Sequence, residues 1–218
     1  MRPDADLRGC TAAHALLLAS LADLTDARAR SASSLPGWSV GHVITHLARN
    51  ADAFRRVVEG AGRGDVASMY DSMAQRYSDI GAGAGRPAVE LLADLTSATA
   101  ALEQAWSAAT ASTWETGRGT GPAGQFGVAE TPWRRWRETS IHHGDLSPTF
   151  DATVLSEEYL LGDLPRHLAD LPRRLDIETR RHLMAWLLDR ADSLGDLRAR
   201  PWQAPPGAPA NAPTQPKP

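Results

Sequence analysis

Glu138 and His142 can together bind a metal ion if the segment that carries them is helical. They are four positions apart, so on a helix their β-carbons lie about 5–6 Å from each other on one face. Zinc-type ions bond to imidazole nitrogen and carboxylate oxygen at roughly 2.0–2.2 Å, so one ion can bridge the two side chains. The spacing leaves a second interpretation open, because Glu–His pairs of this kind also occur on exposed helix faces.

A third ligand has to come from another part of the chain. His46 is the candidate if its segment faces that of Glu138, because helix bundles build metal sites from side chains on facing helices. His42 and His46 form a rival pair at the same four-residue spacing. Asp145 follows His142 by one turn and can orient a ligand imidazole through a hydrogen bond.

The lysine, cysteine and remaining histidine side chains limit the classes of enzyme to which the protein can belong. Lys217 is the only lysine, so the chain lacks a buried Schiff-base lysine and a phosphate-loop lysine. This excludes most pyridoxal enzymes and nucleotide triphosphatases. Cys10 has no neighbouring sequence feature that would lower its pKa, and we expect it to be inert. His14, His167 and His182 are isolated in the sequence and are interpreted as structural.

Length and composition indicate one core with an appendage. The chain has 218 residues, of which 42% are hydrophobic and 22% charged, as in ordinary soluble proteins. No apolar stretch approaches the roughly 20 residues that span a bilayer. The net charge of −3 gives no broad cationic surface for nucleic acid. With a single cysteine and no secretory signal pattern, we expect a cytoplasmic protein without a membrane or nucleic-acid partner.

Four segments have the hydrophobic spacing of amphipathic helices. They cover residues 7–29, 39 to about 59, 87 to about 109, and 131–143. Ser39 is the N-cap candidate of the second segment, and Pro87 and Pro132 stand near the starts of the third and fourth. These segments place His46 on the second helix and the Glu138–His142 pair on the fourth.

Two glycine-rich stretches separate these helices. Residues 60–86 are predicted to form a long loop with a short helix around 72–79, and residues 117–127 a second loop or a loose hairpin. Four helices with two such connections predict a mainly α protein built on a four-helix bundle.

The rest of the chain is predicted to form an annex and a tail. The bundle takes residues 1–150, and a short helical or small α/β annex takes residues 151–202, with helical patterns at 156–171 and 178–192. Residues 203–218 are rich in proline and alanine and are predicted to be disordered.

Several motifs resemble one known family. The run LPGWSVGHVITHLARNAD at residues 35–52 resembles the signature of the mycothiol-dependent maleylpyruvate isomerase family, within the DinB-like superfamily. Further segments agree in the same order: MY at 69–70, RYSDIGAGA at 76–84, PWRRWRE at 132–138 and IHHGDL at 141–146. The likeness covers about residues 10–150. It implies a DinB-like four-helix bundle followed by a smaller C-terminal part.

The resemblance also implies site residues and cofactors. It implies that His46, Glu138 and His142 bind a divalent metal, with zinc as the first choice, and it favours His46 over His42. It names mycothiol as the thiol cofactor. The segment AWLLDR at 185–190 resembles a family segment whose arginine is a substrate-binding or catalytic residue, which gives this role to Arg190, although an aspartate stands where the family has glycine.

The expected reaction follows from an open position on the metal. Three protein ligands leave room for a thiol, which the metal deprotonates near neutral pH. The thiolate would add to the cis double bond of maleylpyruvate or a similar diacid, the new single bond would rotate, and elimination would give the trans product. Arg190 as catalytic residue and Arg76 as substrate-binding residue would hold the carboxylates. For Arg76 a second interpretation stays open, a solvated charge on a loop.

Two alternative functions stay open at the level of sequence. One is a mycothiol S-transferase, in which the thiolate attacks an electrophile and stays attached. The other is a non-catalytic bundle that senses a metal or binds a partner. The sequence does not indicate the oligomeric state.

Overall fold

The computed structural model describes residues 1–188, 190, 191 and 193. Within this part the chain is mainly helical, which confirms the predicted fold class. The α-helices are α1 (Asp4–Ser20), α2 (Asp26–Arg30), α3 (Val40–Gly62), α4 (Met73–Ala84), α5 (Ala88–Ala108), α6 (Ala111–Thr116), α7 (Thr131–Gly144), α8 (Glu157–Arg174) and α9 (Ile177–Leu187). Two short 3₁₀ helices cover Val128–Glu130 and Ala152–Val154. The strands are β1 (Ala67–Ser68), β2 (Arg118–Gly121) and β3 (Gly124–Gly127).

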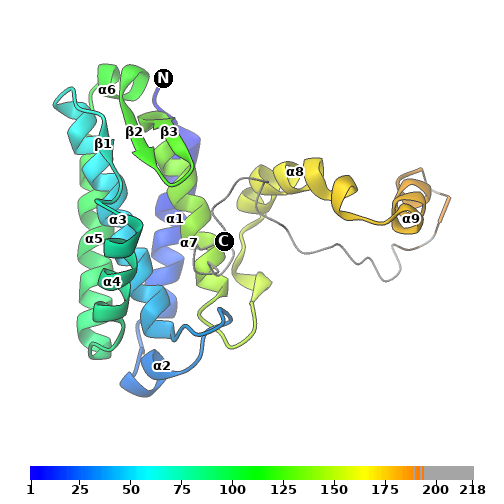
Figure 1. Cartoon of the computed structure of the whole chain (residues 1–218), viewed down its shortest axis with the longest axis horizontal. Helices are drawn as coiled ribbons and strands as arrows, with labels where there is room; N and C mark the ends of the chain where they lie inside the picture. Colours follow the sequence, from blue (N-terminus) through cyan, green and yellow to red (C-terminus); the bar gives the residue numbers. More distant parts are fainter. Residues whose placement is uncertain (189, 192, 194–218) are drawn as a thin grey trace. The chain divides into compact units, whose positions relative to one another are not determined.

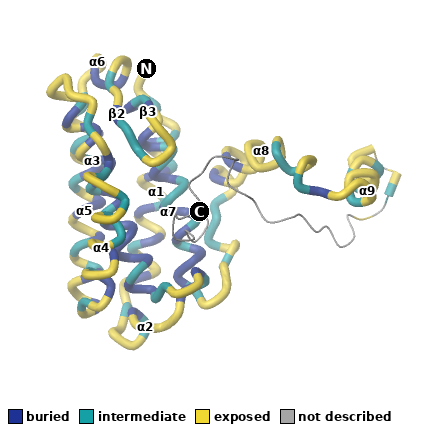
Figure 2. The backbone as a smooth tube through the Cα atoms, in the orientation of Figure 1, coloured by how far each residue is buried: buried dark blue, intermediate teal, exposed yellow. Residues whose placement is uncertain are grey.

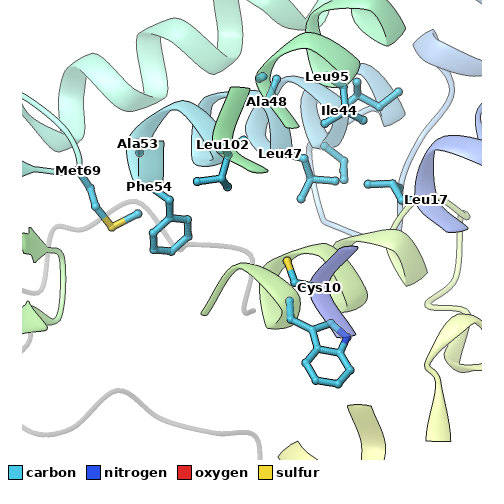
Figure 3. Packing of buried hydrophobic residues seen from close by; sticks show 14 of the residues in the cluster. Cys10, Leu17, Ile44, Leu47, Ala48, Ala53, Phe54, Met69, Leu95 and Leu102 are labelled. Carbon is cyan, nitrogen blue, oxygen red and sulfur yellow. The ribbon is translucent and has the colours of Figure 1, made fainter. Parts of the chain in front are cut away.

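Four long helices form the bundle (Figure 1). Helix α3 packs against α5 and α1 against α7, while contacts of α3 with α7 and of α1 with α5 close the arrangement. Their inward faces are buried and their outward faces exposed (Figure 2). The core is built from aliphatic side chains such as those of Leu17, Ile44, Leu47, Leu95 and Leu102, all almost fully buried (Figure 3). Burial of this apolar surface is the main force that holds α3 and α7 at a fixed separation.

Predicted helix starts agree with the structure. The Ser39 hydroxyl accepts a hydrogen bond from the backbone N–H of His42, and the His42 ring accepts one from the backbone N–H of Ser39. This capping box fixes the first turn of α3. Pro87 immediately precedes α5, and Pro132 lies in the first turn of α7, as predicted.

The single helix predicted over residues 7–29 is wrong in one respect, because the first helix ends at Ser20. A turn follows, and the hydroxyl of Thr25 then accepts a hydrogen bond from the backbone N–H of Arg28 to cap the separate helix α2. Residues such as threonine favour helix caps over helix interiors. The apolar spacing does not take this preference into account and therefore predicts one continuous helix.

The short helix predicted around residues 72–79 is present as α4, but the loop predicted around it is shorter than expected, because α3 continues to Gly62 and α4 to Ala84. The hydroxyl of Ser72 caps this helix by accepting from the backbone N–H of Gln75. A β-carbon at Gly83 would lie only 2.5 Å from the Thr45 side chain on α3, and one at Gly41 would collide with the Ala84 carbonyl. These glycines therefore allow α3 and α4 to approach closely, and they do not mark a loop.

The second glycine-rich stretch forms a hairpin, one of the two predicted alternatives. Strands β2 and β3 are antiparallel, with Gly119 opposite Phe126, and Gly124 has a positive φ of 104° at the turn. Strand β1 joins β2 in parallel to complete a three-stranded sheet.

The chain divides into two compact units, one of residues 1–159 and one that begins at Leu160. The described part of the second unit holds the remainder of α8 and all of α9, close to the predicted helical patterns. The predicted disordered tail, residues 203–218, lies outside the described residues. Among the helices that are described, none has the length and apolar character needed to cross a membrane.

Candidate metal centre

Helices α3 and α7 bring three potential metal ligands together inside the bundle. His46 comes from α3, and Glu138 and His142 come from adjacent turns of α7. One ligand atom from each lies within 4.8 Å of the other two. The Oε2 atom of Glu138 is 3.0 Å from Nε2 of His46 and 3.7 Å from Nε2 of His142. Two imidazoles and one carboxylate form a donor set suited to zinc and related divalent ions.

His142 is held in place by the residue that the sequence indicated. Its Nδ1 lies 2.8 Å from Oδ2 of Asp145, and the other carboxylate oxygen of Asp145 accepts a hydrogen bond from the Ser34 hydroxyl. Asp145 is buried, so this arrangement is shielded from solvent. A carboxylate bound at Nδ1 fixes the ring orientation and leaves Nε2 as the nitrogen that faces Glu138.

His46 is hydrogen-bonded on both sides. Arg76, on α4, lies with Nη2 3.1 Å from Nδ1 of His46. A guanidinium group only donates, so Nδ1 accepts and the ring proton resides on Nε2, which donates to Glu138. Burial lowers the pKa of His46 to about 4, so its ring is neutral at pH 7.

Glu138 is ionised in this setting. Burial acts to raise the pKa of its carboxyl group, but the hydrogen bond from His46 and the nearby charge of Arg135 act in the opposite direction, and the net effect is a lowered pKa. A neutral imidazole and a carboxylate are the protonation states that bind a metal ion.

His42 does not join this cluster. Its Nδ1 accepts from the backbone N–H of Ser39 and lies 2.8 Å from the Ser39 hydroxyl, so the ring serves the start of α3. Of the two histidines that spacing left open, His46 is the one that lies in the cluster with Glu138 and His142.

Arg76 links the cluster to a pocket of about 470 Å³ between α3 and α4. Its guanidinium carbon lies 5.5 Å from the centre of the Tyr70 ring and 5.2 Å from that of Tyr77. Tyr70 and Arg76 both line this pocket. The pocket arginines are Arg49, Arg55, Arg56, Arg63 and Arg76, and its acidic residues are Asp52, Glu59, Asp71 and Asp79.

Arg190 lies in the second unit, which is described by itself. It follows α9, is exposed, and donates from Nη1 to the carbonyl of Leu188 at 3.1 Å. Its role stays a prediction from the family resemblance.

Sequence reasoning missed two polar residues beside the cluster. Asn50 donates from Nδ2 to Oε2 of Glu138 at 3.4 Å, and its Oδ1 accepts from Arg135 at 2.9 Å. Their positions in the sequence could have indicated this. Asn50 follows His46 by four positions and Arg135 precedes Glu138 by three, so each lies on the same face of its helix as a candidate ligand.

Comparison with known proteins identifies the family. Residues 10–147 match the family described as the mycothiol maleylpyruvate isomerase N-terminal domain. The chain belongs to this family. Two crystal structures of a mycothiol-dependent maleylpyruvate isomerase, one of them a histidine-to-alanine mutant, are similar in fold, with TM-scores of 0.66 and 0.65. Each is 24% identical in sequence, and the match covers 75% of this chain and 70% of the other.

A comparison with curated protein sequences gave no significant match. The family and the two structural matches confirm the resemblance and the DinB-like fold that the sequence motifs predicted.

Proposed function

We propose that this protein is a metal- and mycothiol-dependent enzyme that isomerises maleylpyruvate or a similar unsaturated diacid. The observation that carries the proposal is the convergence of donor atoms from His46, Glu138 and His142 beside an arginine-containing pocket, in a member of this family. Zinc is the first choice of metal because the donor set is two imidazoles and a carboxylate. A cytoplasmic location stays a prediction.

Three protein ligands leave at least one coordination position for a further ligand. A divalent metal bound there would lower the pKa of a thiol, so that the thiolate is present near neutral pH. The chain itself supplies no such thiol, because its single cysteine, Cys10, is fully buried and burial raises the pKa of its thiol. An external low-molecular-weight thiol fits these facts, and mycothiol is the one that the family name gives.

Arg76 is suited to bind a carboxylate of the substrate. The other pocket arginines each have a carboxylate within ion-pair distance, whereas within the described part of the chain Arg76 has none. Its guanidinium contacts His46 Nδ1 instead. A guanidinium that is not already neutralised offers paired donors to an anionic ligand.

Metal binding would make Arg76 available. When His46 uses Nε2 as a ligand, its neutral ring carries the proton on Nδ1. Nδ1 would then not accept the hydrogen bond from Arg76 that is seen in the structure, and the guanidinium would be free to bind a substrate carboxylate. The pocket volume of about 470 Å³ is sufficient for a small diacid together with part of a thiol cofactor.

In the proposed reaction the thiolate sulfur forms a bond to one carbon of the cis double bond, and the electron pair moves toward the adjacent carbonyl group. Rotation about the resulting single bond is followed by elimination, in which the C–S bond breaks and the thiolate is regenerated. Arg76 would keep a carboxylate in place during this rotation, and Arg190 is the proposed second clamp.

The test is a turnover assay with zinc-loaded protein, mycothiol and maleylpyruvate, followed by absorbance and by titration of free thiol. The proposal predicts loss of the cis substrate with full recovery of free mycothiol. Consumption of thiol in step with substrate would favour the S-transferase alternative. Persistence of the substrate with metal fully loaded would refute the isomerase.

A further inference from the structure

A second layer of buried polar residues lies directly behind the candidate metal ligands. Arg135 is fully buried, and Asn50 and His14 are 3% and 2% exposed. Arg135 and Glu138 share one face of α7, and Asn50 and His46 share one face of α3. Each helix thus contributes to both layers, and the layers meet where Asn50 contacts Glu138.

Arg135 makes several hydrogen bonds to neutral acceptors. Its Nη1 donates to the Leu47 carbonyl at 2.8 Å and to Oδ1 of Asn50 at 2.9 Å. Its Nε donates to Nε2 of His14 at 3.0 Å, and Nδ1 of His14 is 2.8 Å from the Glu103 carboxylate. Within the described residues, no carboxylate lies within ion-pair distance of Arg135. Burying a charge without a direct counter-charge costs free energy, so the presence of Arg135 here calls for an explanation beyond packing.

The explanation lies in the two ends of the Asn50 amide. An amide offers one acceptor end and one donor end, and either end could turn toward Glu138. Arg135 can only donate, so it holds Oδ1 of Asn50 on its own side and directs Nδ2 to Oε2 of Glu138. The hydrogen bond from His46 reaches the same oxygen, and the two contacts together set the rotation of the carboxylate.

We propose that Arg135 is a positioning residue for the metal centre, which acts through Asn50 to orient the Glu138 carboxylate. This inference rests on the proposed metal site and is independent of which reaction the site catalyses. His14 and Glu103 hold Arg135 from the opposite side. Outer residues of this kind typically change metal affinity by about 10–100-fold.

The first test compares Arg135→Lys with Arg134→Lys as a matched control. Lysine keeps the positive charge but cannot reproduce the forked contacts of the guanidinium. The control changes the neighbouring arginine, Arg134, which forms an ion pair at 2.8 Å with Glu130, the residue that immediately precedes α7. In a chelator competition, Arg135→Lys should raise the zinc Kd by about 10-fold or more, and the control should not change it. The cobalt-substituted Arg135→Lys protein should also show an altered ligand-field spectrum.

Asn50→Ala keeps the test decisive if Arg135→Lys does not fold. Asn50→Ala should raise the zinc Kd of the folded protein to a similar extent. The double variant should lose little more than either single variant, because both act through one amide. Unchanged zinc affinity in folded Asn50→Ala or Arg135→Lys, or fully additive losses in the double variant, would overturn the inference. If the unmodified protein itself bound no zinc, the proposed metal site would fail first.

Discussion

Acidification should destabilise the fold through a buried histidine, His14. Burial lowers the pKa of His14 from 6.5 to about 4, with the Arg135 charge adding to this effect and the hydrogen bond to Glu103 opposing it. The unfolded chain therefore binds a proton at His14 that the folded chain does not, between about pH 6.5 and 4. The stability associated with a neutral His14 is complete above pH 6.5 and is lost as the pH falls through this window.

The expected size follows from the two pKa values. Between pH 7 and pH 5, this single group should reduce the free energy of unfolding by about 2 kcal/mol. The change that isolates it is His14→Gln, because a glutamine amide can accept from Arg135 and donate to Glu103 without titrating.

The assay is urea unfolding of metal-free protein at pH 7 and pH 5, followed by tryptophan fluorescence. The unmodified protein should lose about 2 kcal/mol more than His14→Gln between these pH values. His46→Gln is a second variant for the same assay, because burial lowers the pKa of His46 to about 4 as well. An equal pH dependence in the unmodified protein and in His14→Gln would refute the assignment of a neutral, buried His14.

Three further predictions concern the site. His46→Ala should reduce bound metal well below one equivalent by elemental analysis while the far-ultraviolet circular dichroism stays helical, and stoichiometric metal would contradict the ligand assignment. Arg76→Ala should lower kcat/KM for a diacid by about 10–100-fold, which corresponds to the loss of one charge-assisted hydrogen bond. The control Arg63→Ala removes a pocket arginine that is paired with Asp65, and it should have little effect on kcat/KM. Equal losses in the two variants would exclude a specific role for Arg76. Cys10→Ser should keep full turnover, since burial raises the pKa of this thiol, and a large loss would show that the thiol takes part.

The sequence predicted local features of the site better than distant ones. The spacing of Glu138 and His142 and the caps at Ser39 and Pro132 depend on residues within one helical turn, and the structure agrees with them. The partnership of His46 with Glu138 depends on how α3 and α7 pack. Residue spacing alone could not predict this partnership, whereas the resemblance of the motifs to the family did.

The errors have physical causes of the same kind. The glycine-rich pattern predicts a loop at Gly83, although the missing side chain of this residue makes room for Thr45 on a neighbouring helix. Arg135 and Asn50 went unnoticed because their contact joins residues far apart in sequence, each of a type usually found on the surface. Only the packed bundle shows that they are buried and which way their polar atoms point.

The most direct measurement of the central claim is the absorbance of cobalt-substituted protein during titration with mycothiol. If the metal at His46, Glu138 and His142 binds and deprotonates the thiol, an intense thiolate-to-cobalt charge-transfer band should appear and saturate at one thiol per metal. The band should be absent in His46→Ala. Full cobalt occupancy at the three ligands with no such band at saturating mycothiol would contradict the account.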